Sequence, residues 1–383
     1  MVSSTGLNHL ISFYKKVQVH FGQNSMIKRL TSFLIVTIFL FCITCCKVNI
    51  SEEKNPFMPV IVPEMVKVSG GTINGADNSL YTSKGSFPSE RRVQLSNFYI
   101  GKYEITQEQY YSVMWDQKVT VKGIDGVKFQ LEPNPSYCQA DSDEYHSFEG
   151  EIQEKRPVEG ITWFDAIWFC NALSKKEKLN PAYKITVTEV SSVNLSSHIT
   201  DAEVEFISSA NGYRLPTECE FEYASRGGDV NKPDWNFLFS GIDTEPSEKL
   251  ANVNKKCDQV AWYRYNNRTG ESSTSENRQD DTYFYYKGTH EVGKRKPNRL
   301  GLYDMSGNVS EFCYAKINEN ISPKYTGELE SNPVRLDENG NHIFTAGGSW
   351  RTGATACYVH NFAPNMPGNR NDTWGFRVVR SAK

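Results

Sequence analysis

Cysteine and histidine are the residues of this 383-residue chain best suited to metal binding or redox chemistry. After residue 46 the cysteines are Cys138, Cys170, Cys219, Cys257, Cys313 and Cys357. None of them has the C-x-x-C spacing of a zinc cluster. The pattern favours separate thiols, and Cys170 and Cys219 occupy helical positions where we expect them to be buried.

A second group of useful side chains lies near the C-terminus, between Trp350 and Trp374. Aromatic residues offer rigid contact area and asparagines offer adaptable hydrogen bonds, the combination that antibody paratopes use. Either of the two tryptophans could instead be scaffold, since both flank glycine motifs, and the same alternative holds for the rest. The predicted ligand contacts are Trp350, Arg351, Thr352, Tyr358, His360, Phe362, Asn365, Met366, Asn371 and Trp374.

Three threonines mark the beginnings of helices that would position these groups. Each precedes an acidic or amide residue by three positions, in the pairs Thr106/Gln109, Thr162/Asp165 and Thr217/Glu220. In such a pair the hydroxyl caps an early backbone N–H, and the second side chain returns to the threonine's own N–H. Apolar residues at helical spacing follow each pair. After residue 227 no helical periodicity is visible.

The remaining segments predict short strands and loops. We expect strands at 66–68, 93–95 and 98–100, the last two as a pair, and loops or insertions at 136–156, 185–210 and 265–289. The C-terminal third is aromatic, rich in glycine and rich in turns. Together with the three helices, this predicts an irregular α+β fold with one core.

Residues 1–46 are predicted to be a targeting segment. A basic stretch at 26–29 precedes a mostly apolar run that ends in Cys45 and Cys46, where a bacterial lipoprotein would be cleaved and lipidated. The complete signal predicts that translation starts at Met26. An uncleaved anchor helix is the alternative. Residues 47–63 have the composition of a tether, so the folded domain is predicted to cover 64–381.

The charge balance gives no reason to expect a nucleic-acid partner. The formal net charge is −3, and short basic clusters such as 294–296 are typical of a solvated surface.

Seven strings in a characteristic order resemble the formylglycine-generating-enzyme, or sulfatase-modifying-factor, family. They are VSGGTINGA (68–76), FYIGKYEITQEQY (98–110), RPVEGITWFDAIWFCNALS (156–174), GYRLPTECEFEYASRGG (212–228), GLYDMSGNVSEF (301–312), AGGSWRTGATACY (346–358) and WGFRVVRS (374–381). The resemblance implies a C-type-lectin-like fold with bound calcium. It places one calcium ion at Asn308 and Glu311, for which a turn with ordinary hydrogen bonds is the alternative.

The resemblance also implies where an oxidase would hold copper. Family members that oxidise a sulfatase cysteine use two cysteines, five residues apart, as thiolate ligands. This chain has Thr352 at the first position and Cys357 at the second. A hydroxyl does not replace a thiolate on Cu(I). We therefore expect no copper, and we interpret Cys357 as a core residue that would be catalytic only if the chain were an oxidase after all.

Two further relatives of the family suggest other roles. Iron oxygenases that make thiohistidine betaines need clustered histidines, which the seven histidines here do not form, and an additional helical domain, for which the chain has no room. Variable lipoproteins diversified by retroelements carry changeable residues at the C-terminus of the same domain, and the stretch 350–374 resembles their cassette. An ordinary asparagine-rich loop is the alternative.

These observations predict a binding protein. We expect an exported lipoprotein, held at the cell surface or in the periplasm of a bacterium by its N-terminal lipid, whose C-terminal face binds a protein or a glycan. The alternatives are an oxidase that converts cysteine to formylglycine and a structural accessory of an envelope complex.

Overall fold

The computed structural model describes residues 59–75, 85–139, 150–193, 196–244, 250–267 and 288–382. The predicted signal and most of the predicted tether lie outside these residues. So does the apolar run with its two lipidation cysteines, Cys45 and Cys46. In the described ranges, no helix is both long enough and apolar enough to cross a membrane.

Four α-helices are described, three of which begin where the capping pairs predict. The helices are α3 (Gln107–Met114), α4 (Trp163–Lys176), α5 (Glu218–Ser225) and α6 (Leu250–Val260), and the 3-10 helices are η2 (Gln153–Lys155), η3 (Pro233–Asn236) and η5 (Ala354–Cys357). Thr106, Thr162 and Thr217 each form the complete reciprocal capping box. The capping predictions are therefore confirmed at all three positions.

The fourth helix, α6, was missed. Its apolar residues recur at 250, 253, 257 and 260, but lysines and asparagines lie between them and no capping pair precedes them. Val253, Cys257 and Val260 are buried in the structure. This spacing is helical, but without a capping pair nothing marked where the helix begins.

The strands form several small sheets. They are β1 (Met65–Val68), β2 (Gly71–Ile73), β3 (Arg92–Leu95), β4 (Phe98–Gly101), β5 (Lys118–Val119), β6 (Phe129–Gln130), β7 (Tyr183–Val193), β8 (Ser196–Phe206), β9 (Ser310–Phe312), β10 (Leu329–Ser331), β11 (Ile343–Ala346), β12 (Phe362–Asn365), β13 (Trp374–Gly375) and β14 (Val379–Ser381). The sheet orders are β1-β4-β14, β10-β3-β2, β12-β11-β9-β13, β5-β6 and β7-β8. Several sheets therefore join strands from distant parts of the chain.

Two predictions about strands were wrong. Segment 185–210 is mostly the β7–β8 hairpin rather than a loop, and register shifts between Val187 and Val190 interrupt the alternation that would have revealed it. Strands β3 and β4 exist as predicted, but β3 pairs with β2 and β10, whereas β4 pairs with β1 and β14. Two residues between strands do not ensure a hairpin when each strand finds a partner elsewhere.

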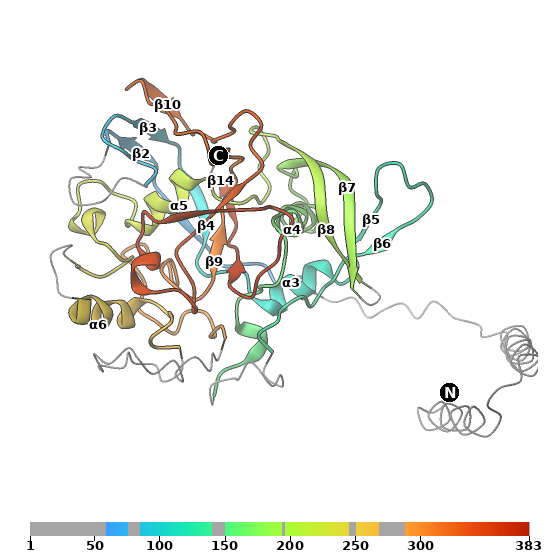
Figure 1. The fold of residues 1–383 in the computed structure, drawn as a ribbon, viewed down its shortest axis with the longest axis horizontal. Helices are drawn as coiled ribbons and strands as arrows, with labels where there is room; N and C mark the ends of the chain where they lie inside the picture. The colour runs from blue at the N-terminus through green and yellow to red at the C-terminus, as the bar shows by residue number, and fades with distance from the viewer. Residues whose placement is uncertain are drawn as a thin grey trace, which may run out of the picture. The chain divides into compact units, whose positions relative to one another are not determined.

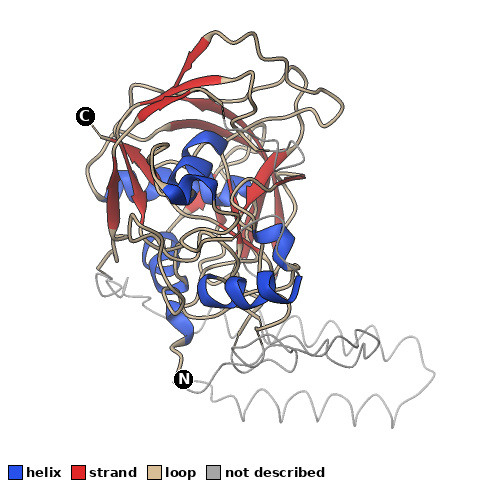
Figure 2. Cartoon of the chain, turned by 90° about the vertical axis from the view of Figure 1, so that its left-hand side faces the viewer, coloured by secondary structure: helices blue, strands red, loops and turns tan. Residues whose placement is uncertain are grey.

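The helices organise the core. One buried cluster surrounds α3 and α4, a second includes the buried face of α5, and a third lies under α6 and η5. Figure 1 shows the β7–β8 hairpin and α6 on opposite sides of the domain, and Figure 2 shows the helices among short strands and long loops. The prediction of an irregular α+β fold is confirmed.

Candidate functional site

The predicted ligand-binding stretch begins after β11 and returns along β12. The two strands pair antiparallel, so Ala346 lies opposite Phe362 and residues 347–361 connect them. Gly348 lies near the start of this connection with a φ of 69°, and a Cβ atom there would lie 2.8 Å from the Sγ atom of Cys357. Glycine therefore lets the connection close tightly over Cys357.

Thr352 is held by its own turn. Its hydroxyl accepts a hydrogen bond from the backbone N–H of Ser349 at 2.8 Å and donates to the carbonyl oxygen of the same residue at 3.0 Å. The Oγ1 atom lies 3.9 Å from the Sγ atom of Cys357, so the two positions do adjoin. A hydroxyl that caps a turn occupies the place where a copper-binding thiolate would stand.

A second thiol close to Cys357 comes from Cys257 in α6, which sequence spacing could not connect with it. Both cysteines are fully buried in the same apolar cluster, and neither forms a disulfide. Burial, followed by a hydrogen bond with Cys357, raises the pKa of Cys257 well above its usual range. The copper site that the family resemblance implies uses positions 352 and 357, and Thr352 leaves that pair without its first thiolate.

Two of the ten predicted contacts belong mainly to the scaffold. Trp350 is fully buried, and its indole N–H donates to the backbone carbonyl oxygen of Asp372 at 2.9 Å, so its prediction as a ligand contact is corrected. Phe362 is only 9% exposed and packs against Phe344, with 5.6 Å between ring centroids. Its remaining exposed edge lines a cavity described below.

Three predicted contacts are open or partly open at the surface. Arg351 is exposed and forms an ion pair with Asp372 at 3.2 Å. Met366 is 44% exposed. Asn365 is half-buried, and its amide donates to the hydroxyl of Thr345 at 2.9 Å.

The remaining predicted contacts are half-buried. Tyr358 lies between the rings of Phe239 and His360, at 5.2 and 5.6 Å. Burial lowers the pKa of His360 to about 4, so this imidazole is neutral at physiological pH. Trp374 meets Phe312 edge to face, and the side-chain oxygen of Asn371 accepts from the backbone N–H of Thr373, which holds a turn. The structure therefore divides the predicted face into a surface group and a supporting group.

Asn308 and Glu311, the predicted calcium ligands, are engaged with protein groups. Both carboxylate oxygens of Glu311 accept hydrogen bonds from Arg377 at 2.6 Å. The side-chain oxygen of Asn308 accepts from the backbone N–H of His290, and its amide donates to Glu104. The Arg377 guanidinium neutralises Glu311 and would repel a cation. Asn308 and Glu311, as placed here, therefore do not fit a calcium ion.

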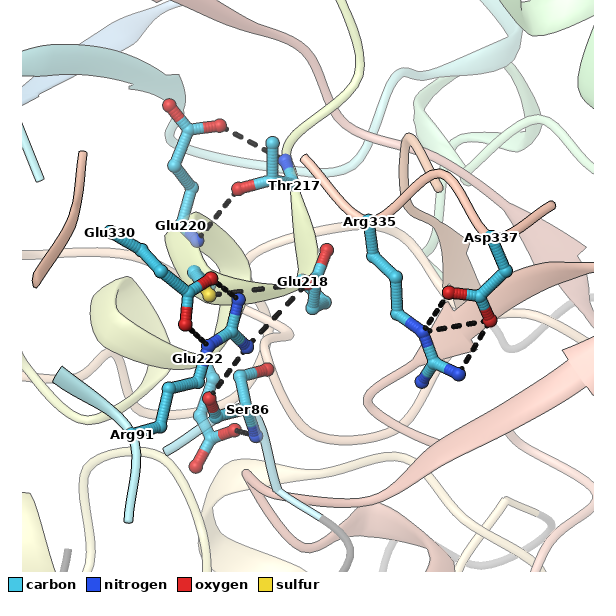
Figure 3. A network of polar contacts seen from close by, with 10 residues as sticks. Ser86, Arg91, Thr217, Glu218, Glu220, Glu222, Glu330, Arg335 and Asp337 are labelled. Carbon is cyan, nitrogen blue, oxygen red and sulfur yellow. Dashed lines mark hydrogen bonds and ion pairs between the residues drawn. The ribbon is translucent and has the colours of Figure 1, made fainter. Parts of the chain in front are cut away.

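A cavity of about 490 Å³ was not predicted from the sequence. Residues 85–91, the first turn of α5, residues 317–325 and the β11–β12 hairpin surround it. Figure 3 shows the polar network on its α5 side. Its lining includes Ser86, Arg91, Glu218, Tyr325, Phe344 and Phe362.

Charged groups meet in this cavity from distant parts of the chain. The Nε and Nη2 atoms of Arg91 donate to the two carboxylate oxygens of Glu330 at 3.0 and 2.9 Å. Its Nη1 atom donates to the carbonyl oxygen of Ser86 and lies 3.8 Å from Glu218 (Figure 3). Burial raises the pKa of Glu218 to about 7, although the charge of Arg91 opposes this shift. Only the helix cap next to Glu218 could be predicted from the sequence, because nothing in the spacing connects residues 91, 218 and 330.

Comparison with known proteins finds relatives that match most of the chain. The chain is 34% identical over 331 residues to "Chaperone protein LppX" from Paenibacillus barcinonensis, covering 83% of this chain and 89% of the relative. It is 24% identical to the formylglycine-generating enzyme of Thermomonospora curvata, covering 83% of this chain and 94% of that enzyme. The solved structure of Treponema denticola variable protein 1 matches 83% of this chain and 95% of its own, with 27% identity and a TM-score of 0.57.

A second solved structure, PvdO from Pseudomonas aeruginosa, shares the fold at 19% identity and a TM-score of 0.52, covering 84% of this chain and 95% of its own. The family model of the sulfatase-modifying factor enzyme 1-like domain matches residues 52–382, which is most of the chain. The chain therefore belongs to the family of sulfatase-modifying factor enzyme 1-like domain proteins, as its ordered motifs predicted.

Proposed function

We propose that this chain is an exported bacterial lipoprotein that binds a protein ligand with a non-catalytic domain. The observation that carries the proposal is Thr352, whose hydroxyl caps the turn at Ser349 where an oxidase needs a thiolate. The adjoining Cys357 is fully buried. Without two accessible thiolates, the domain lacks the copper ligands that cysteine oxidation uses in this family.

The proposed binding surface is the exposed part of the C-terminal stretch. Arg351 and Met366 are the exposed predicted contacts, and the half-buried Asn365 precedes Met366 in the chain. Similarity to a relative named a chaperone favours a protein over a glycan as ligand, and similarity to a variable protein favours diversification of the exposed positions.

The lipid anchor at Cys45 or Cys46 and an envelope location remain part of the proposal. A relative named LppX and the apolar run before these cysteines support them. Metabolic labelling with a fatty-acid analogue tests this part. Label in the chain that disappears after Cys45→Ala together with Cys46→Ala is the expected result, and an unlabelled chain would contradict it.

A capture experiment tests the binding function. Purified chain would be immobilised and incubated with an envelope fraction of its own organism, and the captured proteins identified by mass spectrometry. We expect a specific partner that is lost when Arg351, Asn365 and Met366 are all replaced by Ala. The matched control replaces Ile124 and Val127 by Ala, because each is 44% exposed, like Met366, but lies outside the proposed surface. Equal capture by both variants would contradict the proposed surface.

An activity assay addresses the oxidase alternative. Copper-loaded chain would be incubated in air with a cysteine-containing sulfatase peptide, and the peptide mass followed. We expect no conversion of the cysteine. Formylglycine formation above that of a no-protein control would overturn the non-catalytic assignment.

A further inference from the structure

Glu218, which lines the 490 Å³ cavity, has one buried carboxylate oxygen with no hydrogen-bond donor among the described residues. Glu218 is 3% exposed and lines the cavity from the first turn of α5. No described residue donates a hydrogen bond to its Oε2 atom. A buried carboxylate oxygen without a donor is costly, and such groups usually have a partner, which a ligand can supply.

The two arginines of the cavity are already committed to protein carboxylates. Arg91 directs donors to Glu330 and Ser86, as described above. Arg335 donates from Nε and Nη2 to Asp337, with the shortest contact at 2.6 Å. Figure 3 shows both guanidinium groups facing these partners. The cavity therefore has little capacity left for an anion.

The charge that remains in the lining is negative. Carboxylates of Glu90, Glu218 and Glu319 line the cavity, and each of its guanidinium groups is neutralised by a carboxylate that lies outside the lining. A positively charged ligand group would be attracted by this arrangement, and the attraction is strongest at the buried Glu218.

Aromatic rings form the other walls. Tyr325 lies under the Arg91 guanidinium at 4.8 Å, and Phe344 packs beside Phe362. Such rings hold the aliphatic part of a long side chain and attract cations over their faces. The cavity volume falls within the range of small-ligand pockets, which is enough for one long side chain and its flanking backbone.

We propose that this cavity binds a basic side chain of a peptide, an arginine or a lysine, with Glu218 as its counter-ion. The ligand would donate a hydrogen bond from its guanidinium or ammonium group to the Oε2 atom of Glu218. Phe362, a predicted contact, would touch the same ligand from β12. The inference rests on the proposed function only in assigning the basic group to a protein ligand.

Two capped peptides test the cavity itself, without the unidentified partner. They are acetyl-Gly-Arg-Gly-amide and acetyl-Gly-citrulline-Gly-amide, which have nearly the same shape but differ in charge. Binding to the folded chain would be measured by calorimetry or NMR titration at pH 8. We expect saturable binding of the arginine peptide, at least tenfold tighter than that of the citrulline peptide.

Substitutions test whether Glu218 is responsible for the preference for the arginine peptide. Glu218→Gln should remove the preference for arginine, and Glu218→Asp should reduce it because the shorter side chain retracts the charge. Glu203→Gln, an exposed carboxylate in β8, should leave the preference unchanged. Circular dichroism would verify that each variant is folded.

Absence of saturable binding up to 20 mM peptide, equal binding of the two peptides, or a preference that survives Glu218→Gln would each overturn the proposal. Because the wild-type comparison needs no variant, it stands even if a substitution disturbs folding. Failure here, with partner capture intact, would reject the basic-group pocket and leave the proposed binding function in place.

Discussion

Thr352 and Cys357 occupy the two positions where the family resemblance places copper-binding thiolates. The Oγ1 atom of Thr352 lies 3.9 Å from the sulfur of Cys357 and is bonded to its own turn. A sulfur atom in place of that oxygen would put a half-buried sulfur beside the buried Cys357, at the two positions that the copper-binding members of the family use. The residue type, rather than the position of the turn, is what excludes a copper thiolate pair.

Restoring that sulfur is the first prediction. Thr352→Cys should raise the affinity of the chain for Cu(I) at least tenfold, since it adds a half-buried sulfur ligand beside the fully buried thiols of Cys257 and Cys357. Competition with a coloured Cu(I) chelator measures the change. Thr352→Ser is the control, because it keeps a hydroxyl and adds no sulfur. An unchanged Cu(I) affinity would show that Cys357 is too enclosed to share a metal ion.

Glu218 gives a prediction about pH. Its pKa in the folded chain is about 7, above the ordinary value of 4.5, so the folded state favours the protonated form. The stability this provides is complete below about pH 4.5 and is lost as the pH rises through 7. Arg91 and Arg335 face Glu218 and lower its pKa, while burial and Glu220 raise it.

Glu218→Gln should therefore stabilise the chain at pH 8, by roughly 3 kcal/mol if the whole shift is recovered, and should have little effect at pH 4. Urea unfolding of both proteins at pH 4, 6 and 8 checks this. Glu203→Gln should show no such trend, because that residue is exposed. If the free energies of unfolding of wild type and Glu218→Gln differed by the same amount at pH 4, 6 and 8, a raised pKa of Glu218 would be contradicted. A gain in stability on losing Glu218 would be typical of a residue that serves binding.

Among the elements, α4 is tied to the β7–β8 hairpin through one carboxylate. Asp165 accepts hydrogen bonds from the backbone N–H groups of Thr162 and Ile199, and it pairs with His198 at 2.7 Å. It is therefore both the second member of a helix cap and the anchor of β8. All of these groups are buried in the core around α4.

Removing this carboxylate should weaken the helix and the hairpin together. Asp165→Ala is expected to lower the free energy of unfolding by about 3 kcal/mol, because buried donors and an imidazole lose their acceptor. Chemical denaturation measures the loss. Glu189→Ala, on an exposed position of the same hairpin, should change it by less than about 0.5 kcal/mol. Equal effects would mean that Asp165 does not connect the two elements.

What could be predicted from the sequence depended on how local each signal was. The three caps were predictable because each lies within four consecutive residues, and the ordered motifs identified the family. Strand partners could not be predicted, because β4 pairs with β1 and β14, which lie at opposite ends of the domain's sequence. The cavity could not be predicted either, because Arg91, Glu218 and Glu330 come together only in the folded chain. Trp350 was misassigned for a related reason, since residue type does not reveal burial.

Considered as a whole molecule, the domain combines a fixed core with a C-terminal stretch of two kinds of residue. Trp350 and Cys357 are fully buried, while Arg351 and Met366 are open to solvent. If this stretch is a binding surface that changes between copies, its exposed residues should vary and its buried residues should not. Variation at a buried position would cost stability by leaving cavities or strain in the packed core.

Sequencing the last part of this gene in many close isolates, together with any near-copy beside it, tests this account most directly. We predict that substitutions concentrate at the exposed positions between 350 and 374, Arg351 and Met366 among them, and spare Trp350 and Cys357. A reverse transcriptase gene beside the locus would be the expected source of the variation. An unvarying stretch, or substitutions spread equally over buried and exposed positions, would contradict a diversified binding surface.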